Sequence, residues 1–230
     1  MNILLTGVTG YIGQRLLPVL LEQGHHVVCC VRDARRFKYH NYNKNDITVI
    51  EVDFLNPETL KAIPENIEVA YYLIHSMSTL SGDFENMEEV CAQNFKERLD
   101  QTQVKQVVYL SGIVNEIELS RHLTSRKHVE DILSDADFAL TTLRAGIIVG
   151  SGSASFEIIR DLVEKLPAMI TPKWLKTKCQ PIGIRNVIQF LDGVKDKSET
   201  YGQTYDIGGP DILTYKEMLL RFAKIRNLKR

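Results

Sequence analysis

Short apolar runs alternate with segments of helical hydrophobic spacing along most of the chain. The first run, Ile3-Leu4-Leu5, leads into a glycine turn and then into apolar residues at positions 12, 16, 17, 20 and 21, which indicate a helix. Further strands are predicted at 26–31, 47–54, 69–74, 106–110 and 138–143, and further helices at 84–101, 120–134 and 155–166. This alternation predicts an α/β fold, a Rossmann-type doubly wound, mostly parallel sheet with helices on both faces.

Glycine, proline and asparagine residues indicate where two of these helices begin, bend or end. Gly24 is placed to end the first helix, because a glycine just after a helix adopts the left-handed conformation easily. Pro18 lies inside that helix and predicts a local bend rather than loss of the helix. Asn56 and Pro57 predict the cap and first position of a short helix after the third strand.

The regular alternation weakens after residue 166. Residues 167–183 contain three prolines and the single tryptophan, Trp174, and predict an irregular excursion over the sheet. Shorter elements are expected at 184–195, 203–207 and 214–226. We predict one NAD(P)-binding domain over residues 1–230, with a small irregular substrate-side region formed mainly by 145–183 and 200–230.

Composition narrows the class of protein. The formal charge of −1 gives no overall electrostatic reason to expect nucleic acid or an anionic membrane as a partner. No apolar run approaches the ~20 residues of a membrane span, and no secretory leader precedes the first strand. No metal-ligand spacing is present, so no metal is predicted, and the four cysteines are expected to be reduced and mostly buried. These features predict a cytoplasmic protein.

The glycine turn is the strongest chemical signal in the sequence. Gly7, Gly10 and Gly13 follow a predicted strand and precede an amphipathic helix, the context in which such glycines bind a dinucleotide. The first two allow the backbone to approach a pyrophosphate, and the third allows the helix to pack on the strand. Free N–H groups at the helix start favour the phosphates. We predict cofactor contacts from Gly7, Thr9, Gly10, Tyr11, Ile12 and Gly13.

The end of the second strand indicates which cofactor is bound. An acidic residue there typically accepts hydrogen bonds from the ribose of NAD, but that position is Val31, followed by Arg32. A guanidinium can bind a 2′-phosphate, so Arg32 and Arg36 are predicted to favour NADP(H) over NAD(H). Asp33 would restore an acid if the alignment shifted by one residue. The less favoured alternative is that Arg32, Arg35 and Arg36 only form a solvated basic loop.

Two later strand ends are expected to complete the cofactor site. Asp53 and Phe54 follow the third strand, where the Asp53 carboxylate could accept from the adenine amino group or cap a turn. Ile74, His75 and Ser76 end the fourth strand, at the carboxyl edge where ligands of parallel sheets lie.

Several motifs together resemble the atypical short-chain dehydrogenase/reductases, in their NmrA-like, NAD(P)H-binding branch. The motifs are the stretch 6–13, Gly24-His25, Val31-Arg32, Tyr109-Leu110-Ser111-Gly112, Leu143-Arg144-Ala145-Gly146 and the stretch 205–210. The resemblance covers essentially the whole chain. It implies a nicotinamide cofactor and an active site at the end of the fifth strand.

The chain departs from that family at its catalytic positions. Catalytic members use a Tyr-x-x-x-Lys pair on the helix after the fifth strand and a serine just after that strand. Aligning Glu130 with the family places His122 at the tyrosine and Arg126 at the lysine, four residues apart on one helix face. The serine position falls near Ser111 or on Gly112. His122 could donate a proton near neutral pH, and Arg126 could hold the ribose or a phosphate.

Three functions are compatible with these features. The first is an NADPH-dependent reductase of a small carbonyl, enone or quinone, an oxidoreductase with His122 and Arg126 in place of Tyr and Lys. The second is a non-catalytic NADP(H)-sensing protein that regulates an unknown protein partner. The third, an epimerase or dehydratase with a retained cofactor, is disfavoured because the acid–base tyrosine is missing. The sequence identifies neither a substrate nor a partner.

Overall fold

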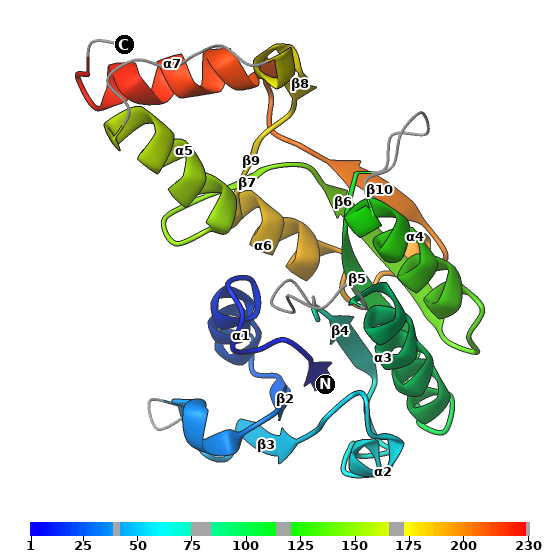
Figure 1. Ribbon diagram of the computed structural model, residues 1–230. Helices are drawn as coiled ribbons and strands as arrows, with labels where there is room; N and C mark the ends of the chain where they lie inside the picture. The colour runs from blue at the N-terminus through cyan, green and yellow to red at the C-terminus, as the bar shows by residue number, and fades with distance from the viewer. Residues whose placement is uncertain (39–41, 75–83, 114–120, 166–172, 229–230) are drawn as a thin grey trace. The chain divides into compact units, whose positions relative to one another are not determined.

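The computed structural model describes the chain except for residues 39–41, 75–83, 114–120, 166–172 and 229–230 (Figure 1). Its main feature is a seven-stranded sheet with the order β10-β6-β5-β4-β1-β2-β3. The strands are β1 (Asn2–Leu5), β2 (His26–Val31), β3 (Ile47–Glu51), β4 (Val69–Tyr72), β5 (Gln106–Gly112), β6 (Ala139–Ala145) and β10 (Thr204–Ile207). The pairs β1·β2, β1·β4, β2·β3 and β4·β5 are parallel. The predicted doubly wound α/β fold is confirmed.

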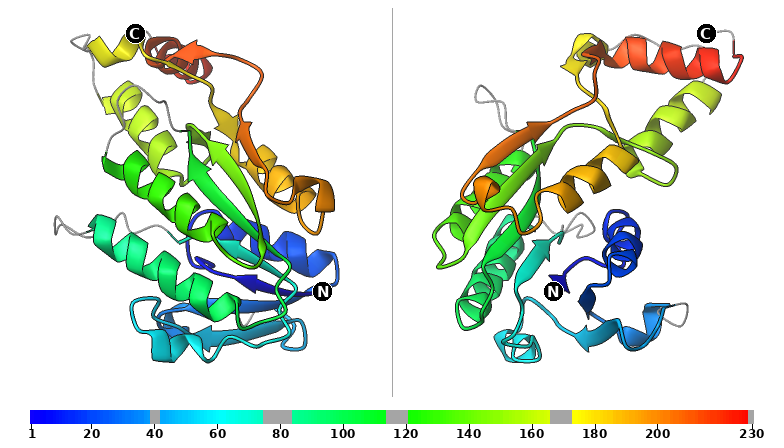
Figure 2. Two further views of the ribbon diagram at one scale, coloured as in Figure 1. Left: turned by 90° about the vertical axis from the view of Figure 1, so that its right-hand side faces the viewer. Right: turned by 180° about the vertical axis from the view of Figure 1, so that it is seen from behind.

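Helices cover both faces of this sheet (Figures 1 and 2). On one face, α3 (Phe84–Leu99) and α4 (Arg121–Ser134) enclose the main core, which includes Tyr72, Cys91, Phe95, Val129 and Leu133. On the other face lie α1 (Gly13–Glu22), with three buried leucines, and α6 (Ile184–Gly193). The buried Tyr71 hydroxyl donates to the Leu191 carbonyl of α6 at 3.0 Å. The central strands β1, β4 and β5 are therefore buried on both faces, which explains their apolar sequences.

The predicted end of the first helix and the predicted start of the short helix after the third strand are confirmed. Gly24 has φ +75°, and its N–H donates to the Leu21 carbonyl at the end of α1. The helix continues across Pro18. Asn56 caps α2 (Pro57–Leu60), which has Pro57 at its first position.

Strands β3 and β4 end earlier than the sequence predicts. The last ladder contact of β3 is the hydrogen bond from the Val52 N–H to the Val31 carbonyl. Directly afterwards the Asp53 carboxylate accepts from the Leu55 N–H, which turns the chain away from the sheet. The prediction of strand to residue 54 was wrong because the apolar Val52 and Phe54 fill the core from a turn.

A buried polar network fastens the segment around residues 194–204 to the sheet. Gln106 of β5 donates from Nε2 to the Val194 carbonyl at 2.9 Å and to Thr141 Oγ1 at 2.8 Å. Its Oε1 accepts from the Asp196 N–H at 2.7 Å. Thr141 in turn donates to the Thr200 carbonyl. Since Gln106 and Thr141 are fully buried, the network ties three chain segments together without help from solvent.

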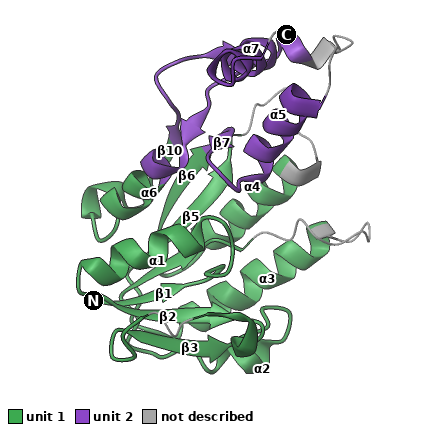
Figure 3. Ribbon diagram, turned by 90° about the vertical axis from the view of Figure 1, so that its left-hand side faces the viewer, with its two compact units in different colours: residues 1–144, 188–205 green, residues 145–187, 206–230 purple. Residues whose placement is uncertain are grey.

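The chain divides into two compact units (Figure 3). The first, residues 1–144 and 188–205, holds nearly all of the large sheet; the second is residues 145–187 and 206–230. The second unit contains α5 (Ala154–Lys165), η2 (Lys173–Lys176), α7 (Tyr215–Ile225) and two small strand pairs, β7 (Ile148–Val149) with β9 (Ile182–Gly183) and β8 (Lys178–Cys179) with β11 (Leu213–Thr214). Its core lies between α5 and α7. The expected single domain with a substrate-side lid stays a prediction.

The cysteines agree with the sequence-based expectation. All four are free, with Cys29, Cys30 and Cys91 buried and Cys179 half-buried. Among the described helices, none is long and apolar enough to cross a membrane.

Candidate functional site

The turn between β1 and α1 requires glycine at two positions for steric reasons. Gly7 has φ +65°, and a Cβ built there would lie 2.5 Å from the Leu73 carbonyl oxygen after β4. At Gly13 a Cβ would lie 2.4 Å from the Gly7 carbonyl oxygen and 2.7 Å from Val8 Cα. Gly10 is less crowded, with its nearest neighbour at 3.1 Å. The turn is thus packed against β4 and against the start of α1, as a dinucleotide-binding turn requires.

The same turn leaves backbone donors at the start of α1. Thr6 fixes its base, because its hydroxyl donates to the Tyr71 carbonyl at 2.9 Å and accepts from the Leu73 N–H at 3.0 Å. The helix begins after Ile12 without a side-chain cap. Within the described chain, the N–H groups of Tyr11 and Ile12 donate to no acceptor. Together with the exposed Thr9 and Gly10, they leave the helix N-terminus open to an anion.

Tyr11 is held by Arg15 one turn along. The Arg15 guanidinium lies 3.8 Å from the Tyr11 ring centroid and donates to the Tyr11 carbonyl at 2.9 Å. The Tyr11 hydroxyl is buried and finds no hydrogen-bond partner among the described residues. A buried hydroxyl without a partner in the protein usually forms its hydrogen bond with water or with a bound molecule.

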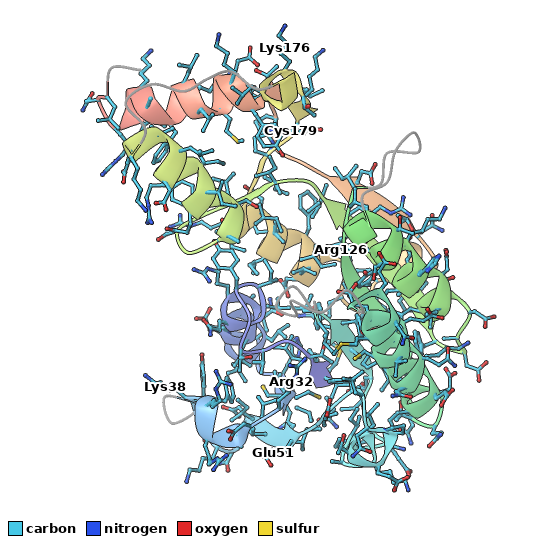
Figure 4. All side chains as sticks on the ribbon, viewed as in Figure 1. Arg32, Lys38, Glu51, Arg126, Lys176 and Cys179 are labelled. Atoms are coloured by element: carbon cyan, nitrogen blue, oxygen red, sulfur yellow. The ribbon has the colours of Figure 1, made fainter. Side chains whose placement is uncertain are left out.

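Asp33, the acidic residue just after β2, is paired with Arg35. Asp33 caps the short helix η1 (Ala34–Arg36) by accepting from the Arg35 N–H, and its two oxygens accept from Arg35 Nε and Nη2 at 2.9 and 3.0 Å. Hydrogen bonding to Arg35 lowers the pKa of Asp33. Arg32 is exposed and forms no hydrogen bond or ion pair within the described chain. Figure 4 labels Arg32 beyond β2 and Glu51 at the end of β3.

Arg36 and Glu51 complete this loop. The Glu51 carboxylate accepts from the Ala34 N–H at 2.8 Å and so fixes the start of η1. Arg36 is exposed, and its N–H donates to the Asp33 carbonyl. The loop therefore presents the Arg32 and Arg36 guanidinium groups from a backbone held by two carboxylates.

Asp53 and Phe54 have different surroundings. Asp53 is exposed, and its Oδ1 accepts from the Leu55 N–H in the turn after β3. The Phe54 side chain is buried in the core, 6.0 Å from the Phe95 ring, and its carbonyl accepts from Asn94. Asp53 can thus face a ligand, whereas Phe54 can line such a site only with its backbone.

The ends of β4 and β5 enclose a small cavity. It is lined by Tyr72, Ile74, Glu88, Cys91, Tyr109, Leu110, Arg126 and Val129 and has about 10 Å³ available to a water-sized molecule, room for about one water. Ile74 is half-buried and packs on the main core. His75 and Ser76 lie outside the described residues.

Arg126 lies at the end of β5, beside Gly112. A Cβ on Gly112 would be 3.7 Å from Arg126 Nη1 and 3.0 Å from Leu123 Cδ2, so a side chain at position 112 would face Arg126. The Ser111 hydroxyl is instead buried, and no group of the described chain lies at hydrogen-bond distance and angle from it. It is still close enough to Tyr109 to lower the pKa of that phenol. Gly112, not Ser111, therefore occupies the position that faces α4.

Tyr109 is a structural neighbour of Arg126. Its hydroxyl donates to the Arg126 carbonyl at 3.3 Å. Burial raises the pKa of Tyr109 to about 12, against the lowering effects of Ser111 and Arg126. The phenol therefore stays protonated at neutral pH. His122 belongs to α4, one turn before Arg126, but its side chain lies outside the described part of the chain.

Sequence reasoning missed a buried contact between α3 and α4. Glu88 and Ser125 are both nearly inaccessible to solvent, and the Ser125 hydroxyl donates to Glu88 Oε2. A signal was present, because Glu88 is in helical phase with Cys91, Phe95 and Leu99, and Ser125 with Val129 and Leu133. The contact fixes the residue that precedes Arg126 and thus the helix turn that carries it.

Comparisons with known proteins agree with this geometry. A family model described as NAD(P)H-binding matches residues 7–161. A mitochondrial protein of Arabidopsis thaliana, NADH dehydrogenase [ubiquinone] 1 alpha subcomplex subunit 9, is 24% identical over 221 residues, which cover 92% of this chain and 54% of the relative. The chain thus spans about half the length of that relative.

Solved structures share the fold at lower identity. A nucleoside-diphosphate-sugar epimerase from Staphylococcus aureus superposes with a TM-score of 0.82 at 15% identity, covering 99% of this chain and 78% of the other. The structure of MoeE5 in complex with UDP-glucose and NAD gives a TM-score of 0.75 at 17% identity, covering 100% and 83%.

Proposed function

Because the chain belongs to the NAD(P)H-binding family, among the atypical short-chain dehydrogenase/reductases, we propose that it binds NADP(H) in preference to NAD(H) and reduces a small carbonyl, enone or quinone. The observation that supports the proposal most is the glycine turn, which packs against Leu73 after β4. An exposed arginine, Arg32, follows the neighbouring strand β2. The residues fit the cofactor. Gly7 and Gly13 allow the turn to pack closely against Leu73 and Val8, and the start of α1 would present free N–H groups to the pyrophosphate.

The preference for NADP(H) rests on the charges at the end of β2. Val31 is buried and cannot accept from a ribose hydroxyl. The nearest acid, Asp33, has both oxygens on Arg35, so it does not compete for Arg32. Arg32 and Arg36 are then available to bind a 2′-phosphate.

Calorimetric titration with NADPH and NADH tests the preference. Arg32→Ala is expected to weaken NADPH binding about 10- to 100-fold, the loss of one or two charge-assisted hydrogen bonds, and to leave NADH binding nearly unchanged. Arg226→Ala is the matched control, because that exposed guanidinium lies just after α7 and binds Glu164. Equal loss in both variants, or loss of NADPH and NADH together, would contradict the assignment of Arg32.

For the reaction, the cofactor would supply a hydride to the substrate carbonyl carbon. His122 would donate the proton to the carbonyl oxygen, since imidazole titrates near neutral pH. Arg126 would hold the ribose without transferring protons, because a guanidinium does not act as an acid in proteins. Its guanidinium lies beside Gly112, one of the two candidates for the family's serine position, where a Cβ would meet Leu123 Cδ2 at 3.0 Å.

Oxidation of NADPH with a panel of carbonyl, enone and quinone compounds tests turnover. Arg126→Ala is expected to raise the Kd for NADPH about 10-fold, because one charge-assisted contact is lost. His122→Ala is expected to reduce kcat by about 100-fold with little change in that Kd. His128→Ala, an exposed histidine on the same helix, should change neither. No turnover at high enzyme concentration would reject the reductase.

One observation favours a second function, a non-catalytic NADP(H) sensor. The Ser111 hydroxyl is buried, and the outward position is glycine, so no hydroxyl from the end of β5 faces Arg126. A sensor would bind the cofactor tightly without turnover and would retain a protein partner in only one redox state. Equal retention of the partner with NADP⁺ and NADPH would count against it.

A further inference from the structure

The two units carry opposite charge, although the whole chain is nearly neutral. The first unit has 16 Lys and Arg against 23 Asp and Glu, and the second has 12 against six. The second unit, with under a third of the residues, therefore has a formal charge of +6. A segment of this kind attracts anionic surfaces even when the net charge of the protein does not.

The most exposed large apolar side chains lie in that same unit. Ile225, Ile212 and Ile158 are 77%, 66% and 61% exposed, more than any other large hydrophobic residue of the described chain. Single exposed apolar residues are ordinary. Two of the three, Ile212 and Ile225, belong to the same part of the basic unit, in or just before helix α7.

Helix α7 brings basic and apolar side chains together. Its inner face, with Met218, Leu219 and Ala223, is buried in the core with α5. On the outside, Leu220 has a lysine one turn before and one turn after it, because residues four apart are neighbours on a helix. We call the residues Ile212, Lys216, Glu217, Leu220, Arg221, Lys224 and Ile225 the α7 surface. Its one acid in the helix, Glu217, is exposed and accepts from the Thr214 N–H and hydroxyl.

An ion pair places the loop before α7 on the same surface. Arg221 binds Asp211 at 2.5 Å, so the adjacent Ile212 lies beside the middle of the helix. Ile225 is one turn beyond Arg221. Lys216 and Lys224 are exposed and take part in no ion pair of the described residues, which leaves their charges available.

We propose that the α7 surface docks the protein on an anionic lipid bilayer. Separate aliphatic side chains between lysines suit a bilayer, since each can enter the boundary of the hydrocarbon region individually while the cations meet phosphate groups. A protein partner would instead require a contiguous apolar centre. The binding is peripheral, in keeping with described helices that are too short or too polar to span. It is independent of the proposed cofactor site.

Vesicle flotation tests the proposal with the full chain. Vesicles of phosphatidylcholine with about one third phosphatidylglycerol are expected to bind the protein at low salt, and vesicles of phosphatidylcholine alone are not. Lys216→Glu/Lys224→Glu should lower the partition coefficient at least about 10-fold, and high salt should have a similar effect. Ile212→Ser/Ile225→Ser should lower it about 10-fold at unchanged charge.

Matched variants in the first unit control for charge and hydrophobicity. Lys61→Glu/Lys105→Glu makes the same change of charge, and Val90→Ser removes an exposed apolar side chain; neither should reduce binding. All variants should keep the wild-type melting temperature and NADPH affinity, which separates this surface from the cofactor site. Equal binding to neutral vesicles, equal loss in the controls, or retention on DNA without vesicle binding would overturn the proposal.

Discussion

Replacing Gly7 by alanine is expected to abolish most cofactor binding. The new Cβ would sit 2.5 Å from the Leu73 carbonyl oxygen, so the turn must move away from β4. A displaced turn loses backbone hydrogen bonds to the pyrophosphate, and two such charge-assisted bonds correspond to about 100-fold in affinity. Positive φ and the collision together should lower the free energy of unfolding by about 2–4 kcal/mol. Calorimetric titration with NADPH and urea unfolding measure the two effects.

Gly24→Ala separates the collision from the backbone strain. Gly24 has a similar positive φ, +75°, but nothing lies within 4 Å of its Cβ position. Alanine there should cost about 1 kcal/mol of stability and leave NADPH affinity unchanged. If Gly7→Ala bound NADPH like the wild type, the turn would not be the pyrophosphate site.

A loss of stability comparable to that of Gly7→Ala is expected from Gln106→Leu. Leucine has nearly the same volume but cannot replace the hydrogen bonds to the Val194 carbonyl and the Asp196 N–H. Since these groups are buried or partly buried, leaving them unpaired should lower the free energy of unfolding by about 3 kcal/mol. Urea unfolding followed by circular dichroism measures it.

Gln93→Leu provides the comparison for Gln106. Gln93 is exposed on α3 and bonds only Glu97 one turn away, so the same substitution should change stability by less than about 0.5 kcal/mol. Similar unfolding midpoints for the two variants would mean that solvent reaches the Gln106 network.

The fold could be predicted from the sequence because its signals are local. The apolar run 26–31, bounded by Gly24 and Arg32, reads as a buried strand, and the strand has those bounds. Asn56-Pro57 likewise predicts a helix start from two local preferences, Asn as a cap and Pro at the first helical position. The third strand was predicted too long because Val52 and Phe54 are apolar. An apolar, buried residue can belong to a strand or to the turn that follows it.

The candidate site was less predictable because it depends on contacts between distant segments. Asp33 was an open alternative for ribose binding until the structure showed both its oxygens on Arg35. Glu88 resembles a surface acid in the sequence, and only the packing of α3 on α4 gives it Ser125 as a partner. That Ser111 is buried while Gly112 faces Arg126 follows from how the end of β5 meets α4.

The strand order has a consequence for how the polypeptide acquires its structure. The N-terminal strand, β1, is in the interior of the sheet between β2 and β4, and β10 closes the far edge. During synthesis β1, β2 and β3 can associate within the first 51 residues, but the partners of Gln106 emerge some 90 residues after it. Until then the Gln106 amide can bond Thr141 of β6 but lacks the Val194 carbonyl and the Asp196 N–H. Because these contacts join residues far apart in the sequence, they slow folding. The unpaired edge of the sheet is meanwhile exposed to other nascent chains.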